Sequence, residues 1–257
     1  MSNFKENWKI FWKNVWEAIK ASILPLVMYF AASSCVFMVT LQEDMCGKLT
    51  EGLNGARIAW IVGAALVALV YHGFISYANG GVGYEMLVSG NMKRMTSGNM
   101  KISSHKEEKE YRPWRGVAAS ALIAVFVLVA GILMGANQSV IDPAMANAKD
   151  EIDMPTGMVI MVFIIFLLSG WSIMPFFFAN VVSTLNGAAT ISYYWTCLFA
   201  ILPLLVGGIF YVVGAYGKRA AAIKAQELAD KTSKEQTEKP KKVNYGGLPG
   251  TKPKKKK

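Results

Sequence analysis

The longest uncharged stretch of the chain, residues 154–217, contains no Asp, Glu, Lys, Arg or His. A helix that crosses the hydrocarbon core of a bilayer needs about 20 apolar residues, so this stretch has room for at least two crossings. Three further segments, residues 21–41, 58–78 and 116–136, are also long and apolar enough to span a bilayer. The sequence therefore predicts an all-α polytopic integral membrane protein with five apolar segments.

Charged residues lie between these apolar segments, and the sign of the charge alternates along the chain. The N-terminus and residues 79–115 are basic, whereas residues 42–57 and 137–154 carry more acidic than basic side chains. Because loops rich in Lys and Arg stay on the cytosolic side of a membrane, we expect the N-terminus and the loop at 79–115 to be cytosolic. The other two loops are expected to face outward.

The basic tail, residues 217–257, should also be cytosolic, and this conflicts with two simple crossings in the uncharged stretch. The chain enters that stretch from the outside, so two crossings would return it to the outside. Gly170 and Pro175 are residues that interrupt helices. We therefore predict a break near residues 169–175 that creates either a sixth pass or a re-entrant hairpin. The alternative is a single kinked crossing over residues 157–180 and a tail that violates the charge rule.

The first 20 residues combine aromatic and basic side chains at helical spacing. Trp8, Trp12 and Trp16 recur on one face, and lysines fill the other. This pattern is typical of an amphipathic helix that lies in the membrane interface, and it predicts such a helix over residues 1–20. An ordinary lead-in to the first span is the alternative. The lysines indicate contact with anionic lipid headgroups.

The chain is therefore divided into the interfacial helix, a transmembrane helical domain at residues 21–216 and the basic tail. Within the transmembrane domain, the Gly-rich residues 79–85 are expected to form a flexible exit from the bilayer. The tail begins with a short segment of helix-forming residues, and its remainder, which is rich in Lys, Pro and Gly, is predicted to be largely disordered.

Enzyme chemistry is disfavoured because ionisable side chains are so scarce in the predicted spans. No span contains Asp or Glu, and His72 is the single histidine in any of them. An intramembrane ionisable residue is a functional candidate, so His72 is the candidate polar site; a hydrogen bond to a neighbouring helix is its alternative role. The sequence has no metal-ligand spacing and no nucleotide-binding motif. We therefore expect no catalytic residues, no cofactor and no metal.

Two other sets of residues are singled out by their positions. A solute site between discontinuous helices would be lined by Trp171, Asn180, Tyr193 and Tyr194. Gly131 and Gly135 have the Gly-x-x-x-Gly spacing that allows helices to approach closely. That spacing suits either a dimer seam or an internal helix contact, and we favour the internal contact.

Two functions fit these patterns. The first is the membrane component of a small-solute transport system in the cell membrane. The second is a non-transporting accessory or scaffold protein that docks a cytosolic or membrane protein partner through its basic loop and tail. Nucleic acid is disfavoured as a partner because no aromatic platform or binding motif accompanies the lysines.

Overall fold

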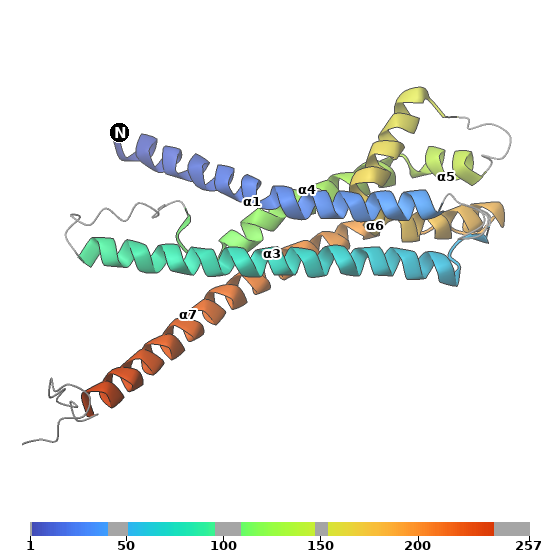
Figure 1. Cartoon of the computed structure of the whole chain (residues 1–257). Coiled ribbons are helices and arrows are strands. Elements are labelled where there is room, and N and C mark those ends of the chain that lie inside the picture. The colour runs from blue at the N-terminus through green and yellow to red at the C-terminus, as the bar shows by residue number, and fades with distance from the viewer. Residues whose placement is uncertain (1, 41–50, 96–108, 147–153, 239–257) are drawn as a thin grey trace, which may run out of the picture. The chain divides into compact units, whose positions relative to one another are not determined.

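The computed structural model describes residues 2–40, 51–95, 109–146 and 154–238, and all regular structure within these ranges is helical. The elements in chain order are α1 (Ser2–Thr40), α3 (Gly55–Met95), α4 (Arg115–Ala136), α5 (Gln138–Ala146), α6 (Thr156–Leu185), the 3-10 helix η3 (Tyr193–Ala200) and α7 (Ile201–Glu238) (Figure 1). The chain divides into two compact units, unit 1 at residues 1–218 and unit 2 at residues 219–257.

Among the described residues, five helical segments are long and apolar enough to cross a membrane, which confirms the all-helical fold with long apolar helices. The number of passes and the cytosolic position of the termini stay predictions. They are α1, α3, α4, α6 and the combined η3 and α7. Large apolar side chains on these helices face outward; Val70 is 71% exposed and Phe74 is 66% exposed on α3. Exposure of this kind is unfavourable in water and is expected of helices that are surrounded by lipid.

α1 is a single helix that runs without interruption from residue 2 to residue 40. The segment at residues 1–20, expected as an interfacial helix, is therefore continuous with the first span. Its aromatic side chains remain outside the core, as shown by Trp8, Trp12 and Trp16, each more than half exposed. That this segment lies in the membrane interface stays a prediction.

α3 continues to Met95, so the start of the predicted loop at 79–115 is helical instead. The Gly-rich residues 79–85, expected as a flexible exit, serve in helix packing. A Cβ atom at Gly80 would overlap the backbone carbonyl of Tyr211 in α7, and Gly214 of α7 meets the backbone of α3 in the same way. The two helices can approach so closely only because both positions lack a side chain.

α6 folds back on itself at Ser169, whose φ of −134° and ψ of 16° are not helical. The rings of Phe166 and Phe177 lie 4.9 Å apart, although a straight helix would separate their Cα atoms by about 16 Å. Figure 1 shows the two limbs, residues 156–168 and 170–185, meeting at an angle. After the fold, the Trp171 backbone N–H donates a hydrogen bond to the Ser33 hydroxyl in α1 (3.3 Å). The predicted break is thus present in the structure.

Both limbs of α6 reach the same end of unit 1. In the first limb, Phe163 packs on Phe37 near the end of α1, with ring centroids 5.6 Å apart. In the second limb, the Phe178 ring lies 4.6 Å from the guanidinium carbon of Arg57, near the start of α3. Since α1 ends where α3 begins, α6 enters and leaves the helical bundle at one end.

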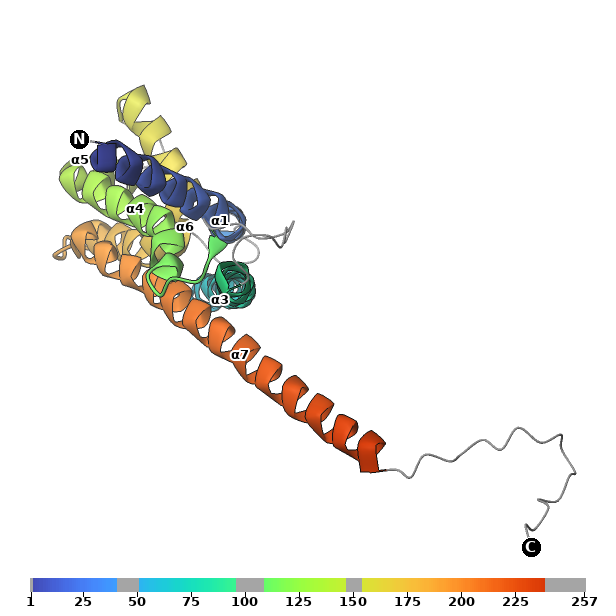
Figure 2. The same cartoon turned by 90° about the vertical axis from the view of Figure 1, so that its left-hand side faces the viewer.

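The two ends of unit 1 differ in what fills them. We call the end that contains the α6 limbs the apolar end, and its core includes Val36, Ile61, Met134, Ile141, Phe166, Phe177 and Phe178. A middle cluster around Tyr29 and Trp171 follows. We call the other end, which carries Lys20, Lys109 and Arg115, the basic end. Figure 2 views unit 1 nearly along the axis of α3.

In unit 2, α7 continues to Glu238, and its side chains over residues 219–233 are exposed. The remainder of the tail, which is predicted to be disordered, lies outside the described residues.

Candidate functional site

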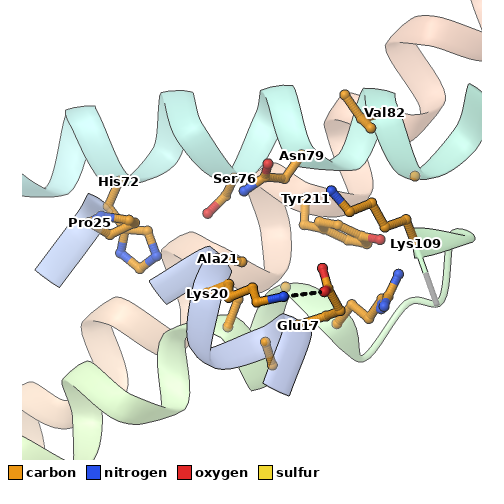
Figure 3. Close-up of a pocket in the computed structure, with 15 residues that line it drawn as sticks. Glu17, Lys20, Ala21, Pro25, His72, Ser76, Asn79, Val82, Lys109 and Tyr211 are labelled. Carbon is orange, nitrogen blue, oxygen red and sulfur yellow. Dashed lines mark hydrogen bonds and ion pairs between the residues drawn. The ribbon is translucent and has the colours of Figure 1, made fainter. Parts of the chain in front are cut away.

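A polar cavity of about 260 Å³ lies at the basic end of unit 1, between α1, α3, α4 and α7 (Figure 3). Its polar and charged lining comes from four parts of the chain: Glu17, Lys20, His72, Ser76, Asn79, Lys109, Arg115 and Tyr211. Two larger hollows, of about 390 and 580 Å³, are lined almost entirely by apolar side chains, and a third, of about 440 Å³, has Asn14 and Arg112 among apolar residues. Of these four hollows, the cavity at the basic end has the largest set of functional groups to recognise a polar ligand.

One face of α3 supplies a line of polar side chains that runs from the cavity mouth into the bundle. His72, Ser76 and Asn79 are four and three residues apart, so they lie above one another on one helix face. Asn79 is exposed at the mouth, Ser76 is 6% exposed and His72 is 1% exposed. Because α3 is otherwise apolar at this depth, this line marks the path along which the cavity penetrates the bundle.

His72 forms the inner end of the cavity and is held by two neighbouring helices. Ser120 of α4 donates its single hydroxyl hydrogen to the Gly116 carbonyl (2.9 Å). The Ser120 hydroxyl also forms a hydrogen bond with His72 Nε2 (3.0 Å), and the Tyr29 hydroxyl of α1 forms one with His72 Nδ1 (3.2 Å). Both ring nitrogens of the histidine are thus hydrogen-bonded, and the residue joins α1, α3 and α4.

The α1 side of the mouth carries an ion pair within one helical turn. Lys20 Nζ lies 3.0 Å from the Glu17 carboxylate, as the dashed line in Figure 3 shows. The lysine side chain is half exposed, and an exposed pair at this spacing contributes only about 0.3 kcal/mol to stability. Its role in the cavity is therefore to place charge at the mouth.

The opposite side of the mouth is formed by the segment that leads into α4. The Tyr111 backbone N–H donates to the Gly83 carbonyl of α3 (2.9 Å), and its ring stacks on Tyr211 of α7 with centroids 5.5 Å apart. Arg115 Nη1 donates to the Glu110 backbone carbonyl (3.0 Å). These contacts fasten the segment to α3 and α7, so that Lys109 and Arg115 both line the cavity.

His72, the candidate polar site, lines the cavity, whereas the four residues expected to line a solute site lie elsewhere. Trp171 is buried in the middle cluster, where its ring lies 5.2 Å from Tyr29. Asn180 and Tyr193 come together at the apolar end, and Tyr194 is 52% exposed. The structure therefore brings together only two of the four expected lining residues.

Asn180 and Tyr193 belong to a buried hydrogen-bond cluster around Asp142. The Asp142 carboxylate accepts from the Tyr193 hydroxyl (2.8 Å) and from Gln138 Nε2 (2.9 Å). The Asn180 side chain accepts from the Ile191 N–H and donates to its carbonyl, both at 2.8 Å. Burial raises the pKa of the Asp142 carboxyl above its ordinary value, and the hydrogen bonds from Gln138, Tyr193 and Asn180 oppose that rise. The cluster fastens α5 and α6 to the start of η3.

The two glycines with the Gly-x-x-x-Gly spacing face η3. A Cβ at Gly131 would overlap the Thr196 and Cys197 side chains, and one at Gly135 would press against the Tyr194 ring at 2.8 Å. The close approach that this spacing permits is therefore used in the structure for a helix contact inside the chain.

Sequence reasoning missed Asn79, Lys109 and Arg115 as cavity residues, and it placed Asp142 in an outward loop. Asp142 lies in α5, and this residue is only 4% exposed. A usable signal existed for the cavity: the polar line on α3 follows helical spacing and leads into a Gly-rich segment. No comparable signal existed for Asp142, because its partners come from other elements.

Within the described residues, no group of three or more His, Cys, Asp or Glu side chains is placed to hold a metal ion. In comparisons with known proteins, no family model, no curated protein and no solved structure matched this chain. Its function must therefore be argued from the cavity and its surroundings.

Proposed function

We propose that this protein is the membrane component of a small-solute transport system, and that the polar cavity is where solute enters. The observation that carries this proposal is the line of polar groups from the charged mouth to His72, which lies within a helix long and apolar enough to span a membrane. Polar groups at membrane depth are unfavourable unless they face protein or water, and they commonly mark solute pathways.

The folded-back α6 supports a particular topology. α1, α3, α4 and α7 would each cross the membrane, while α6 would enter and leave on one side as a re-entrant hairpin. Four crossings place the N-terminus and the tail on the same side. The basic residues around the cavity support the cytosolic face of the cell membrane for that side.

The position of the helix break is also consistent with transport. Irregular backbone at membrane depth is tolerated only where protein or a water-filled cavity surrounds it. Ser169, Trp171 and Ser172 are each at most 2% exposed, so the break is enclosed by protein. Discontinuous helices frequently form the substrate sites of transporters. In this arrangement the packed apolar end closes the route outward while the cavity is open inward.

The accessory or scaffold function is the second candidate, and one observation favours it. His72, at the inner end of the cavity, already has both ring nitrogens bonded to the protein. An inner end that is closed in this way suits a pocket that holds a ligand or a partner permanently.

Water access to the cavity is tested by substituting Ser76→Cys in a variant whose three native cysteines are replaced. In sealed vesicles, we expect a membrane-impermeant thiol reagent to label this position only from the side that also labels Ser233→Cys in the tail. Val70→Cys is the matched control, because Val70 lies on the same helix but its side chain is exposed on the outer, apolar surface of the bundle. It should react slowly from either side.

Transport is tested with the same variant and a panel of small solutes. A solute that protects Ser76→Cys from labelling should also raise the thermal midpoint of the purified protein and accumulate in proteoliposomes. Absence of any protecting solute, together with co-purification of a membrane partner, would establish the accessory function instead.

A further inference from the structure

The chemistry of the cavity lining indicates which class of ligand it binds, and this inference rests on the proposed role of the cavity. We propose that the cavity binds a phosphate group, carried either by a small soluble phosphate ester or by the headgroup of an anionic lipid. Three features of the described residues lead to this assignment: the sign of the lining charges, the helix that begins at the cavity and the donors along its wall.

The lining charges are mainly positive. Lys20, Lys109 and Arg115 line the cavity together with one carboxylate, Glu17, so these four side chains carry a net charge of +2. Glu17 is paired with Lys20. Glu110, whose backbone oxygen accepts a hydrogen bond from Arg115, does not line the cavity. Apolar helices around a charged cleft concentrate its electric field, so the cavity attracts anions.

The N-terminal end of α4 lies at the cavity and adds to this field. α4 begins at Arg115, and Arg115, Gly116 and Ala119 of its first turns line the cavity. The N-terminus of a helix carries a partial positive charge and backbone N–H groups that bind anions.

Hydrogen-bond donors complete the lining. The Asn79 amide and the Ser76 hydroxyl extend along the α3 wall, and the Tyr211 side chain lies on the α7 wall (Figure 3). A guanidinium group matches the geometry of a phosphate and binds it through two parallel hydrogen bonds. The cavity volume of about 260 Å³ is near the lower limit for small-molecule pockets, which favours a phosphate with a short organic substituent.

The test uses the purified full-length chain in a neutral detergent, with inorganic phosphate and glycerol 3-phosphate as soluble probes. We expect both to bind in a calorimetric titration. Arg115→Gln should weaken binding by about tenfold or more, because it removes a charge-assisted pair of hydrogen bonds. Lys109→Gln, an exposed position whose substitution leaves the packing intact, should weaken it by a smaller factor, and Arg115→Lys should retain part of it.

The lipid source is tested in parallel with nanodiscs of phosphatidylcholine, with and without phosphatidylglycerol. If the headgroup is the ligand, native mass spectrometry should detect phosphatidylglycerol retained by the unmodified chain and lost from Arg115→Gln. Lys13→Gln is the control for general headgroup attraction, since Lys13 is exposed on α1 and lies outside the cavity.

The proposal is overturned if Arg115→Gln and Lys109→Gln match Lys13→Gln with both soluble and lipid probes. The labelling of Ser76→Cys separates this failure from failure of the proposed function. Labelling without phosphate binding would leave the cavity as a solute entry with a different ligand. Absence of labelling would remove the solute-entry role itself.

Discussion

The basic end and the apolar end of unit 1 are built from the same long helices, yet they treat buried polar groups in opposite ways. At the apolar end, Asp142 and Asn180 are bonded to protein partners and buried. At the basic end, Ser76 and Asn79 face an open cavity. A buried polar residue is therefore a poor marker of a binding site unless its surroundings include space.

Side-chain size explains this difference. The apolar end is filled by large residues such as Phe166, Phe177 and Phe178. The cavity walls at the basic end include Ala18, Ala21 and Ala119, whose side chains are too small to fill the gap between helices. Tight packing normally leaves few voids in a protein interior, so this space is a consequence of small residues at facing positions.

The largest expected difference between the two ends is in their response to loss of an asparagine. Asn180→Leu removes both side-chain bonds to Ile191 and leaves its N–H without that partner. We expect the free energy of unfolding to fall by about 3 kcal/mol. Asn79→Leu, at the exposed cavity mouth, should change it by less than about 1 kcal/mol. Unfolding in mixed detergent measures both, and equal losses would contradict the contrast between the ends.

A smaller effect tests whether the cavity reflects loose packing of the whole basic end. Gly80→Ala would force its Cβ into the Tyr211 carbonyl, and overpacking of this kind costs about 2 kcal/mol. Gly63→Ala lies in the same helix, where a Cβ meets nothing within 4 Å. It should be neutral or should stabilise by up to about 1 kcal/mol. If Gly80→Ala is tolerated as well as Gly63→Ala, the basic end is flexible and the cavity is not a fixed feature.

The sequence predicts those features of unit 1 that depend on local signals. Runs of apolar residues predict the spans, and the glycine and proline near Ser169 predict the break in α6. His72 was identified because it is a rare ionisable residue in a span. Its partners could not be identified, because Tyr29 and Ser120 are brought to it from other helices by packing. The Gly-rich start of the 79–115 segment was misinterpreted, since glycine interrupts helices in water but promotes helix contact in membranes.

The smallest expected effect is the pH dependence of the free energy of unfolding that arises from the Asp142 carboxyl at the apolar end. Burial raises the pKa of the folded-state Asp142 carboxyl above its ordinary value. The unfolded chain therefore ionises first, and stability from this group is fully present below about pH 4 and is lost as the pH rises through the folded-state pKa. Asp142→Asn removes the titration at nearly constant volume.

We therefore expect the free energy of unfolding of the unmodified chain, relative to that of Asp142→Asn, to be greatest near pH 4 and to decrease toward neutral pH. Measuring both proteins across this range cancels the contribution of all other carboxylates. A difference that increases with pH would mean that the hydrogen bonds from Gln138, Tyr193 and Asn180 outweigh the desolvation of the carboxylate. In that case the ionised Asp142 carboxylate would stabilise the apolar end. The two ends would then differ in the sign of their charge, negative at the apolar end and positive at the basic end, and not in whether their polar groups are bonded to protein or face open space.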